Sequence, residues 1–209
     1  DTLVIVTALA NPTPRLGLVN RFLVAAYSAG MTPLIVATKS DLASADELHA
    51  AYDPLDVEIW VTAKGDDVDA LRQRLLGHTA VLVGHSGVGK STLINALVPH
   101  SDRRVGDVNI VTGRGRHTST NAEALRFGDG WLIDTPGIRS FGLAHVQPSQ
   151  VIDSFDVLAQ ATADCPRGCT HDEDECALNL YVQEGRAGAH GAALLESVRQ
   201  LMRSMSSAD

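Results

Sequence analysis

The chain has 209 residues, of which 44% are apolar and 20% are charged, and 25 acidic residues against 17 Lys and Arg give a formal net charge of -8. This composition is too apolar for a disordered chain, and no apolar run is long enough to span a bilayer, so we expect a globular cytoplasmic protein with no membrane partner. Three cysteines are an odd number, which excludes a disulfide scaffold, and the acidic balance disfavours nucleic-acid binding through overall charge while allowing a local basic patch.

The first two-thirds of the chain alternates short apolar runs with segments of helical period, which is typical of βαβ units and predicts an α/β fold with a mostly parallel sheet. The expected strands are 3–8, 33–37, 57–62, 80–84, 124–127 and 131–134. The expected helices are 16–29, 45–51, 67–76 and 90–98. The polar, Gly- and Arg-rich run 101–121 is expected to be a long functional loop. Segments 148–160 and 187–205 are expected to be helical.

The sequence GHSGVGKS over residues 84–91 fits the spacing G-x-x-x-x-G-K-S between an apolar strand and an amphipathic helix. Backbone N–H groups of such a loop wrap a phosphate chain, its lysine neutralises the β- and γ-phosphates, and its last hydroxyl binds Mg²⁺. Lys90 and Ser91 stand in these two places. A Gly-rich turn without a ligand is the alternative, but the flanking strand and helix favour a nucleoside triphosphate site. The expected nucleotide contacts are Gly84, His85, Ser86, Gly87, Val88, Gly89, Lys90, Ser91 and Thr92.

A second phosphate element is the run WLIDTPG over residues 131–137. Asp134 is expected to hold the Mg²⁺ shell together with Ser91, and the Gly137 N–H is expected to reach the γ-phosphate. Asp-x-Pro-Gly is also a common turn, but its place at the end of an apolar strand after GHSGVGKS favours the nucleotide interpretation.

Two other strand ends indicate which base is bound. A carboxylate accepts both N1–H and N2–H₂ of guanine, a pairing that adenine does not offer, and Asp41 after the run LIVATKS supplies one. The stem of Lys39 is expected to cover the base face, and the Ala63 N–H is expected to meet guanine O6. The alternative is an ordinary helix start at KSDL with Ser40 or Asp41 as its cap. The contacts expected from these two strand ends are Thr38, Lys39, Ser40, Asp41, Thr62, Ala63 and Lys64.

A cysteine and histidine cluster occupies the sequence CPRGCTHDEDEC, in which Cys165, Cys169, His171 and Cys176 have the spacing C-x₃-C-x-H-x₄-C. Three thiolates and one imidazole form the closed tetrahedral ligand set of structural Zn²⁺. One disulfide with a spare thiol, or coincidence, is the alternative. We therefore expect a domain over residues 1–145 followed by a helical zinc-binding domain over residues 146–209.

These motifs resemble the five sequence elements of Ras-like GTPases in a rotated order, with TKSD and VTAK before GHSGVGKS, GRGRHTST and DTPG. A rotated GTPase followed by a Cys/His cluster resembles the RsgA family over nearly the whole chain. The resemblance implies a circularly permuted P-loop GTPase domain that hydrolyses GTP, is stimulated by the small ribosomal subunit and acts in late maturation of that subunit. It also implies contacts with GTP or GDP, Mg²⁺, the small subunit and its rRNA, and we expect a monomer.

Two features depart from the pattern of that family. The family has an N-terminal OB-fold domain that contacts rRNA, and we expect it to be missing because the first strand begins almost at Asp1. Thr38 stands where the family has the Asn of Asn-Lys-x-Asp. Its hydroxyl is shorter than an amide and cannot make the same two-sided hydrogen bond, which predicts weaker guanine binding.

The expected catalytic residues are His117, Thr118 and Lys90. Ras-type enzymes orient the attacking water with a Gln after Asp-x-x-Gly, and Ile138 stands there, which predicts slow intrinsic turnover. The resemblance points instead to His117, with a solvated loop histidine as the alternative. Thr118 is expected to bind Mg²⁺ or the γ-phosphate when its loop closes, with Thr120 as the alternative.

Basic residues of the same region suit RNA phosphates, although a solvated loop whose arginines reach the nucleotide or nearby carboxylates is the alternative. These residues are Arg103, Arg104, Arg114, Arg116 and Arg126. Two other functions stay open at this point. One is a nucleotide-gated RNA- or ribosome-binding module with negligible turnover, and the other is an ATPase or a permuted GTPase with another RNA partner.

Overall fold

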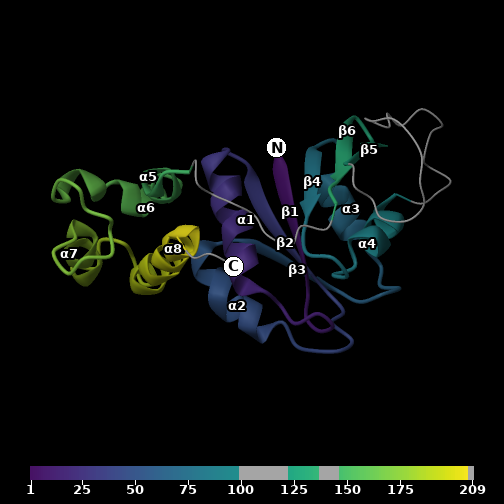
Figure 1. Cartoon of the computed structure of the whole chain (residues 1–209), viewed down its shortest axis with the longest axis horizontal. Coiled ribbons are helices and arrows are strands. Elements are labelled where there is room, and N and C mark those ends of the chain that lie inside the picture. Colours follow the sequence, from purple (N-terminus) through teal and green to yellow (C-terminus); the bar gives the residue numbers. More distant parts are fainter. Residues whose placement is uncertain (99–121, 137–145, 207–209) are drawn as a thin grey trace.

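The computed structural model of the chain describes residues 1–98, 122–136 and 146–206 (Figure 1). Within these residues one six-stranded sheet has the strand order β3-β2-β1-β4-β6-β5. The β5–β6 pair is antiparallel and the other four pairs are parallel, so the predicted mostly parallel α/β sheet is confirmed. The strands are β1 (Thr2–Ala8), β2 (Thr32–Thr38), β3 (Glu58–Thr62), β4 (Thr79–Val83), β5 (Glu123–Phe127) and β6 (Gly130–Asp134).

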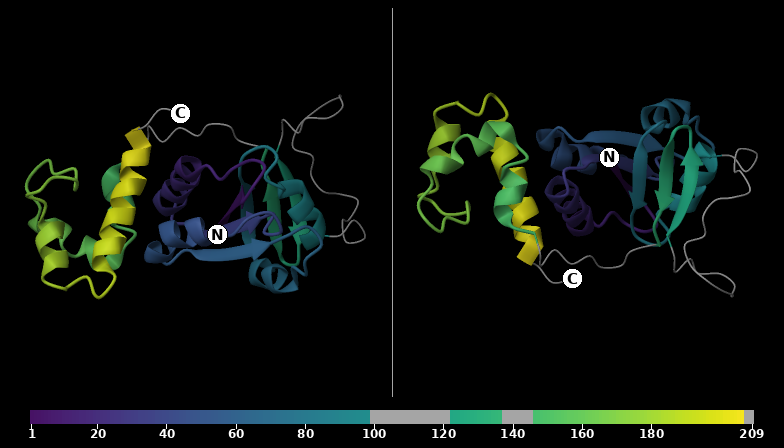
Figure 2. Two further views of the ribbon diagram at one scale, coloured as in Figure 1. Left: turned by 90° about the horizontal axis from the view of Figure 1, so that it is seen from below. Right: turned by 90° about the horizontal axis from the view of Figure 1, so that it is seen from above.

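Strand β1 lies in the interior of the sheet and is buried along its whole length. Because successive strand residues face opposite sides, Ile5 belongs to one hydrophobic cluster and Val4 and Val6 belong to another. Helices α1 (Leu16–Ser28) and α2 (Asp46–Tyr52) contribute to the first cluster. Helices α3 (Asp69–Leu75) and α4 (Lys90–Leu97) contribute to the second, so the sheet is covered on both faces (Figure 2).

The C-terminal helices lie on the side of α1 that faces away from the sheet, and α8 and α5 contact α1 (Figures 1 and 2). They are α5 (Pro148–Ile152), α6 (Asp156–Ala159), α7 (Ala177–Gln183) and α8 (Gly191–Ser206), with a 3₁₀ turn at Thr162–Asp164 between α6 and α7. Another 3₁₀ turn, at Asp53–Leu55, follows α2. None of the helices in the described ranges is both long enough and apolar enough to cross a bilayer.

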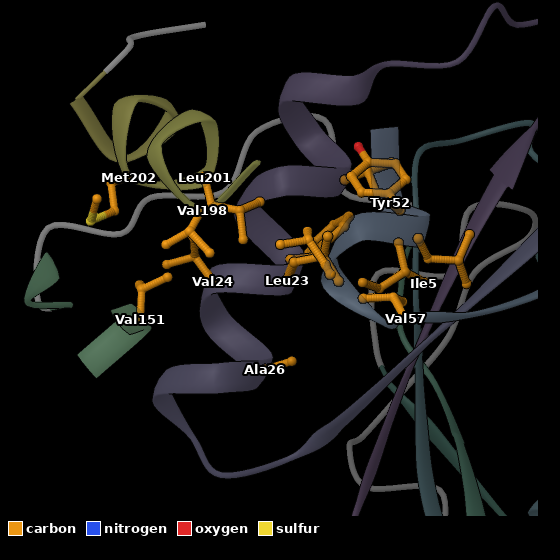
Figure 3. Close-up of a cluster of buried hydrophobic side chains, with 14 of the residues drawn as sticks. Ile5, Leu23, Val24, Ala26, Tyr52, Val57, Val151, Val198, Leu201 and Met202 are labelled. Atoms are coloured by element: carbon orange, nitrogen blue, oxygen red, sulfur yellow. The ribbon is translucent and has the colours of Figure 1, made fainter. Parts of the chain in front are cut away.

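Helix α1 is buried on two sides at once, against the sheet and against α8. Figure 3 shows Leu23 directed towards Ile5, and Val24 directed towards Val198 and Leu201 of α8. The Arg21 Nε also donates to the Ser204 carbonyl oxygen of α8 at 3.2 Å. One hydrophobic cluster therefore runs from the sheet through α1 into the C-terminal helices, while the expected boundary between 1–145 and 146–209 stays a prediction.

The C-terminal region differs from the helices expected there. The expected helical segment 148–160 divides into two short helices, α5 and α6, separated by residues 153–155, where the Phe155 ring packs edge-on against Tyr27 at 4.9 Å between ring centroids. Helix α7 was not predicted, since it follows Cys176 directly and no Ser, Thr, Asp or Asn cap marks its start. The expected helix over 187–205 begins four residues later, at Gly191. The expected long loop over 101–121 lies outside the described residues.

Candidate nucleotide-binding site and metal centre

The candidate nucleotide site lies where parallel strands end. The loops that follow β2, β3, β4 and β6 leave the sheet at its carboxyl edge, because these strands and β1 all run in the same direction. The chain winds outward from β1 in both directions, with β2 and β3 on one side and β4 and β6 on the other. Ligands of open α/β sheets bind in the crevice that this reversal of strand order creates.

The loop after β4 needs glycine for its shape. The backbone of Gly84 has a φ of +155°, and a Cβ added there would lie 2.2 Å from the carbonyl oxygen of Val6. Gly87 and Gly89 have φ values of +83° and +97°, and α4 begins directly afterwards at Lys90. The loop therefore lies against β1 and presents the N-terminus of α4, which is the geometry that binds phosphate groups.

The ammonium group of Lys90 is held over this loop. Lys90 is 8% exposed, and its Nζ donates to the carbonyl oxygen of Gly84 at 3.0 Å. Burial lowers the pKa of Lys90, and the negative charge of Asp134 opposes that shift. Asp134 lies at the end of β6 opposite Leu82 of β4. The Lys90 ammonium and the Asp134 carboxylate are thus close enough to interact beside the phosphate loop. The carboxylate oxygens of Asp134 are hard donors, which suit Mg²⁺.

The start of the DTPG element is fixed to the same strand. The Thr135 hydroxyl donates to the carbonyl oxygen of Leu82 at 2.6 Å, and the Thr135 N–H donates to the same oxygen at 3.3 Å. These bonds attach the chain after β6 to β4 immediately before the phosphate loop. Sequence reasoning did not assign Thr135 a contact, because only the register between β4 and β6 places it there.

A cavity of about 320 Å³ lies beside the phosphate loop. Its volume suits a purine base, and both strand ends expected to recognise the base open into it. The Ser40 N–H donates to the Thr62 carbonyl oxygen at 3.3 Å, which joins these two strand ends. The lining residues are Thr38, Lys39, Asp41, Leu42, Thr62, Ala63, Lys64, Gly65, Asp66, Val68, Gly89, Thr92, Leu93 and Ala96.

Thr38 connects the base pocket to the phosphate loop. Its buried hydroxyl donates to the Val88 carbonyl oxygen at 2.5 Å and lies 3.3 Å from the carbonyl oxygen of Thr7. Although a threonine is shorter than the family's asparagine, it reaches the main chain of the phosphate loop because the loop lies close against β2.

Lys39 forms a second connection between these loops. Its backbone has a φ of +62°, and its Nζ donates to the carbonyl oxygens of Gly87, at 3.0 Å, and of Asn11. Asn11, in the loop after β1, was not anticipated from the sequence. The alternative of a helix capped by Ser40 or Asp41 is wrong, because α2 begins only at Asp46.

The Ala63 N–H, which was expected to meet guanine O6, has a partner within the chain. It donates to the Asp66 Oδ2 at 2.6 Å. Sequence reasoning missed Asp66, although a carboxylate three residues after a turn residue commonly bonds the backbone in this way. In the phosphate loop, the His85 Nδ1 lies 2.8 Å from the carbonyl oxygen of Ser86.

Several predicted site residues lie outside the described residues. They are His117, Thr118, Thr120, Gly137 and Ile138, together with Arg103, Arg104, Arg114 and Arg116. Arg126 is described, and its guanidinium lies 5.1 Å from the centroid of the Trp131 ring across the β5–β6 pair.

The candidate metal centre brings together all four expected ligands. The ligand atoms of Cys165, Cys169, His171 and Cys176 lie within 4.8 Å of one another. All three cysteines are free thiols, so the alternative of one disulfide with a spare thiol is wrong. Desolvation lowers the pKa of His171, which favours the neutral imidazole that binds metals. Three thiolates and an imidazole at this separation could hold one tetrahedral Zn²⁺ ion.

Helix α8 supports the loop that carries these ligands. The Arg199 Nε donates to the His171 carbonyl oxygen at 2.7 Å, and another nitrogen of its guanidinium donates to the Asn179 Oδ1 at 2.8 Å. Arg203 pairs with Asp172 at 2.6 Å. The same helix packs against α1, so α8 joins the metal centre to the α/β sheet.

The order of the nucleotide-binding elements along the chain, compared with their positions in the fold, defines the class of protein. The strands and loops that would recognise the base precede the G-x-x-x-x-G-K-S loop in the chain but lie beside it in space, which is the arrangement of a circularly permuted P-loop GTPase fold. The RsgA GTPase family profile matches residues 1–144, and the chain belongs to this family.

Named relatives agree with this assignment. The chain is 43% identical over 220 aligned positions to the small ribosomal subunit biogenesis GTPase RsgA of Pseudomonas aeruginosa (strain LESB58), with 100% of this chain and 64% of that protein covered. It is 40% identical to the RsgA of Ectopseudomonas mendocina (strain ymp), with 98% of this chain and 62% of that protein covered. The chain thus spans less than two-thirds of the length of these two relatives.

Two solved structures share the fold. The crystal structure of YjeQ from Thermotoga maritima matches with a TM-score of 0.68 and 25% identity, covering 100% of this chain and 72% of that one. The structure of YloQ, described as a circularly permuted GTPase, matches with a TM-score of 0.65 and 25% identity, covering 98% of this chain and 68% of that one.

Proposed function

We propose that this protein binds GTP and hydrolyses it to GDP and phosphate, that the small ribosomal subunit stimulates this turnover, and that the protein acts in late maturation of that subunit. The observation that carries the proposal is the direct link between the phosphate loop and the base pocket. Thr38 and Lys39, at the end of the strand that leads to Asp41, donate hydrogen bonds to the Val88 and Gly87 carbonyl oxygens. One nucleotide can therefore occupy both parts.

Each part of the site has its own role in this reaction. Asp41 pairs with the N1–H and N2–H₂ of guanine, and the glycine-rich loop wraps the phosphates with its N–H groups. The Lys90 ammonium leaves the Gly84 carbonyl oxygen and neutralises the β- and γ-phosphates. Ser91, Thr118 and Asp134 are the residues that would hold Mg²⁺, which would supply positive charge next to the phosphate oxygens. His117 orients the attacking water, and the Gly137 N–H contacts the γ-phosphate.

The other partners belong to the same proposal. Curated relatives are named small ribosomal subunit biogenesis GTPases, which supports the small subunit as a partner. Contact with its rRNA, a cytoplasmic location and a monomeric state are further parts of the proposal. The zinc centre has a structural role, because its four ligands leave no open position and its loop is anchored to α8 by Arg199. A nucleotide-gated binding module without appreciable turnover is the second candidate, favoured by Ile138 at the place of the water-orienting glutamine.

Base recognition is tested with Asp41→Asn, measuring Kd for GDP, XDP and ADP by isothermal titration. The variant should lose GDP affinity and gain XDP affinity, because the asparagine amide donates to the xanthine 2-oxo group. Asp46→Asn, in the first turn of α2, is the control with the same charge change and should leave all three constants unchanged. An unchanged preference for GDP in Asp41→Asn would refute the assigned role.

Turnover separates the two candidate functions. GTP hydrolysis is measured with and without small ribosomal subunits, both for this chain and for a fusion that supplies an N-terminal OB-fold domain. Stimulation by subunits is the expected result. GDP binding with no stimulation in either form would favour the nucleotide-gated binding module.

A further inference from the structure

In the base pocket, the chain itself provides an acceptor for the Ala63 N–H, the group that is expected to bind guanine O6. The Asp66 carboxylate accepts from the Ala63 N–H at 2.6 Å, and both residues line the same cavity as Asp41. This is a short hydrogen bond with a charged acceptor, which is among the stronger hydrogen bonds in proteins. The Ala63 N–H is therefore occupied by the chain itself.

A 6-oxopurine and the Asp66 carboxylate compete for this position. An N–H group donates one proton, and a purine O6 that approached the Ala63 nitrogen would meet the Asp66 Oδ2, an oxygen of like partial charge that already accepts this proton. The carboxylate has to leave before O6 can take its place. Asp41 does not relieve this conflict, because it pairs with the N1 and N2 side of the base.

We propose that Asp66 is a specificity-determining residue that acts as an internal competitor for the O6 atom of the purine, and that it swings away from the Ala63 N–H when the base binds. This inference rests on the proposed binding of guanine nucleotides. Asp66 lowers the affinity for every 6-oxopurine nucleotide, whatever that nucleotide carries at position 2.

The local structure allows this exchange without rebuilding the loop. Asp66 is exposed, so its carboxylate can turn into solvent. The turn also has a main-chain hydrogen bond that does not involve the carboxylate, from the Asp66 N–H to the Ala63 carbonyl oxygen at 3.3 Å. The backbone can therefore keep its shape while the Ala63 N–H changes its acceptor.

The chain provides a matched control in the next residue. The Asp67 carboxylate is not among the residues that line the cavity and accepts instead from the Asp69 N–H at 2.8 Å, at the start of α3. Asp66→Ala and Asp67→Ala remove the same charge from neighbouring positions. A difference between them reports the competition at Ala63 rather than the net charge of the pocket.

The test measures Kd for GDP, IDP and ADP by isothermal titration in the presence of Mg²⁺. Asp66→Ala should bind GDP and IDP about 3- to 10-fold more tightly than the unchanged protein, the size expected for one hydrogen bond. Its ADP affinity should not rise, because adenine has no O6. Asp67→Ala should stay within about twofold of the unchanged protein, and Asp66→Asn, which keeps an oxygen acceptor without the charge, should lie between.

A second readout covers the case in which Asp66→Ala disturbs the loop. The backbone amide resonance of Ala63 should differ between unchanged protein and Asp66→Asn without nucleotide, and should become the same in both once GDP is bound. Persistent difference in the GDP complexes would overturn the exchange of acceptors.

The outcomes separate this inference from the proposed function. GDP binding with equal or weaker affinity in Asp66→Ala than in Asp67→Ala refutes the competitor role alone. Absence of GDP binding in the unchanged protein and in all three variants refutes the proposed function and this inference with it.

Discussion

Leu201→Ala tests whether the C-terminal helices and the sheet share one cooperative core. Leu201 is 1% exposed and belongs to the cluster that α8 forms with α1. Removing a buried leucine side chain beyond Cβ costs about 3 kcal/mol, since the lost burial is added to the cost of the cavity. With a urea m-value of about 2–3 kcal/mol/M, the unfolding midpoint should fall by about 1–1.5 M.

The assay compares two probes of urea unfolding. The chain has two tryptophans, and both lie in the sheet, Trp60 on β3 and Trp131 on β6. Their fluorescence follows the sheet, whereas far-ultraviolet circular dichroism also follows the C-terminal helices. If the core is shared, Leu201→Ala lowers both midpoints together.

Leu180→Ala is the matched control. Leu180 is on α7 and is 59% exposed, so its truncation should change the stability by less than about 0.5 kcal/mol. A tryptophan midpoint that is unchanged in Leu201→Ala, with an earlier transition in circular dichroism alone, would show that the C-terminal helices unfold independently and would refute the reasoning.

Three further predictions concern the site. Lys90→Met should weaken GDP binding about 100-fold in titration calorimetry. Because burial lowers the pKa of Lys90, the charged lysine costs stability that is recovered as the pH rises. The variant lacks this cost, so in urea melts it should be at least as stable as the unchanged protein at pH 7 and should show a flatter rise towards about pH 10. His171→Ala should lose Zn²⁺ by elemental analysis, whereas His190→Ala should retain about one equivalent, and equal metal content would exclude His171 as a ligand. Gly84→Ala should lose about 2 kcal/mol of stability because the new Cβ meets the Val6 carbonyl oxygen, and an unchanged unfolding midpoint would contradict this.

The sheet and its strand ends could be predicted because their signals are local. Short apolar runs bounded by Gly, Asp and Pro mark the strands, and the spacing of GHSGVGKS defines a phosphate loop without any tertiary information. Helix α7 could not be found in this way, because it follows Cys176 without a capping residue that would mark its start.

Side-chain partners far apart in sequence were decided by the fold. The Thr38 hydroxyl reaches the Val88 carbonyl oxygen only because β2 and the phosphate loop meet at the same edge of the sheet. In the same way, the register between β4 and β6 places Thr135 against Leu82. No local pattern encodes either contact.

The sequence by itself determined the ligand types of the two candidate sites and their order along the chain, since residue identity and spacing define their chemistry. Only the tertiary structure decided that Asp66 occupies the Ala63 N–H, and that α8 joins the metal centre to the sheet. The physical reason is that a hydrogen-bonding group takes whichever partner the folded chain brings within about 3 Å, and sequence spacing does not fix that distance.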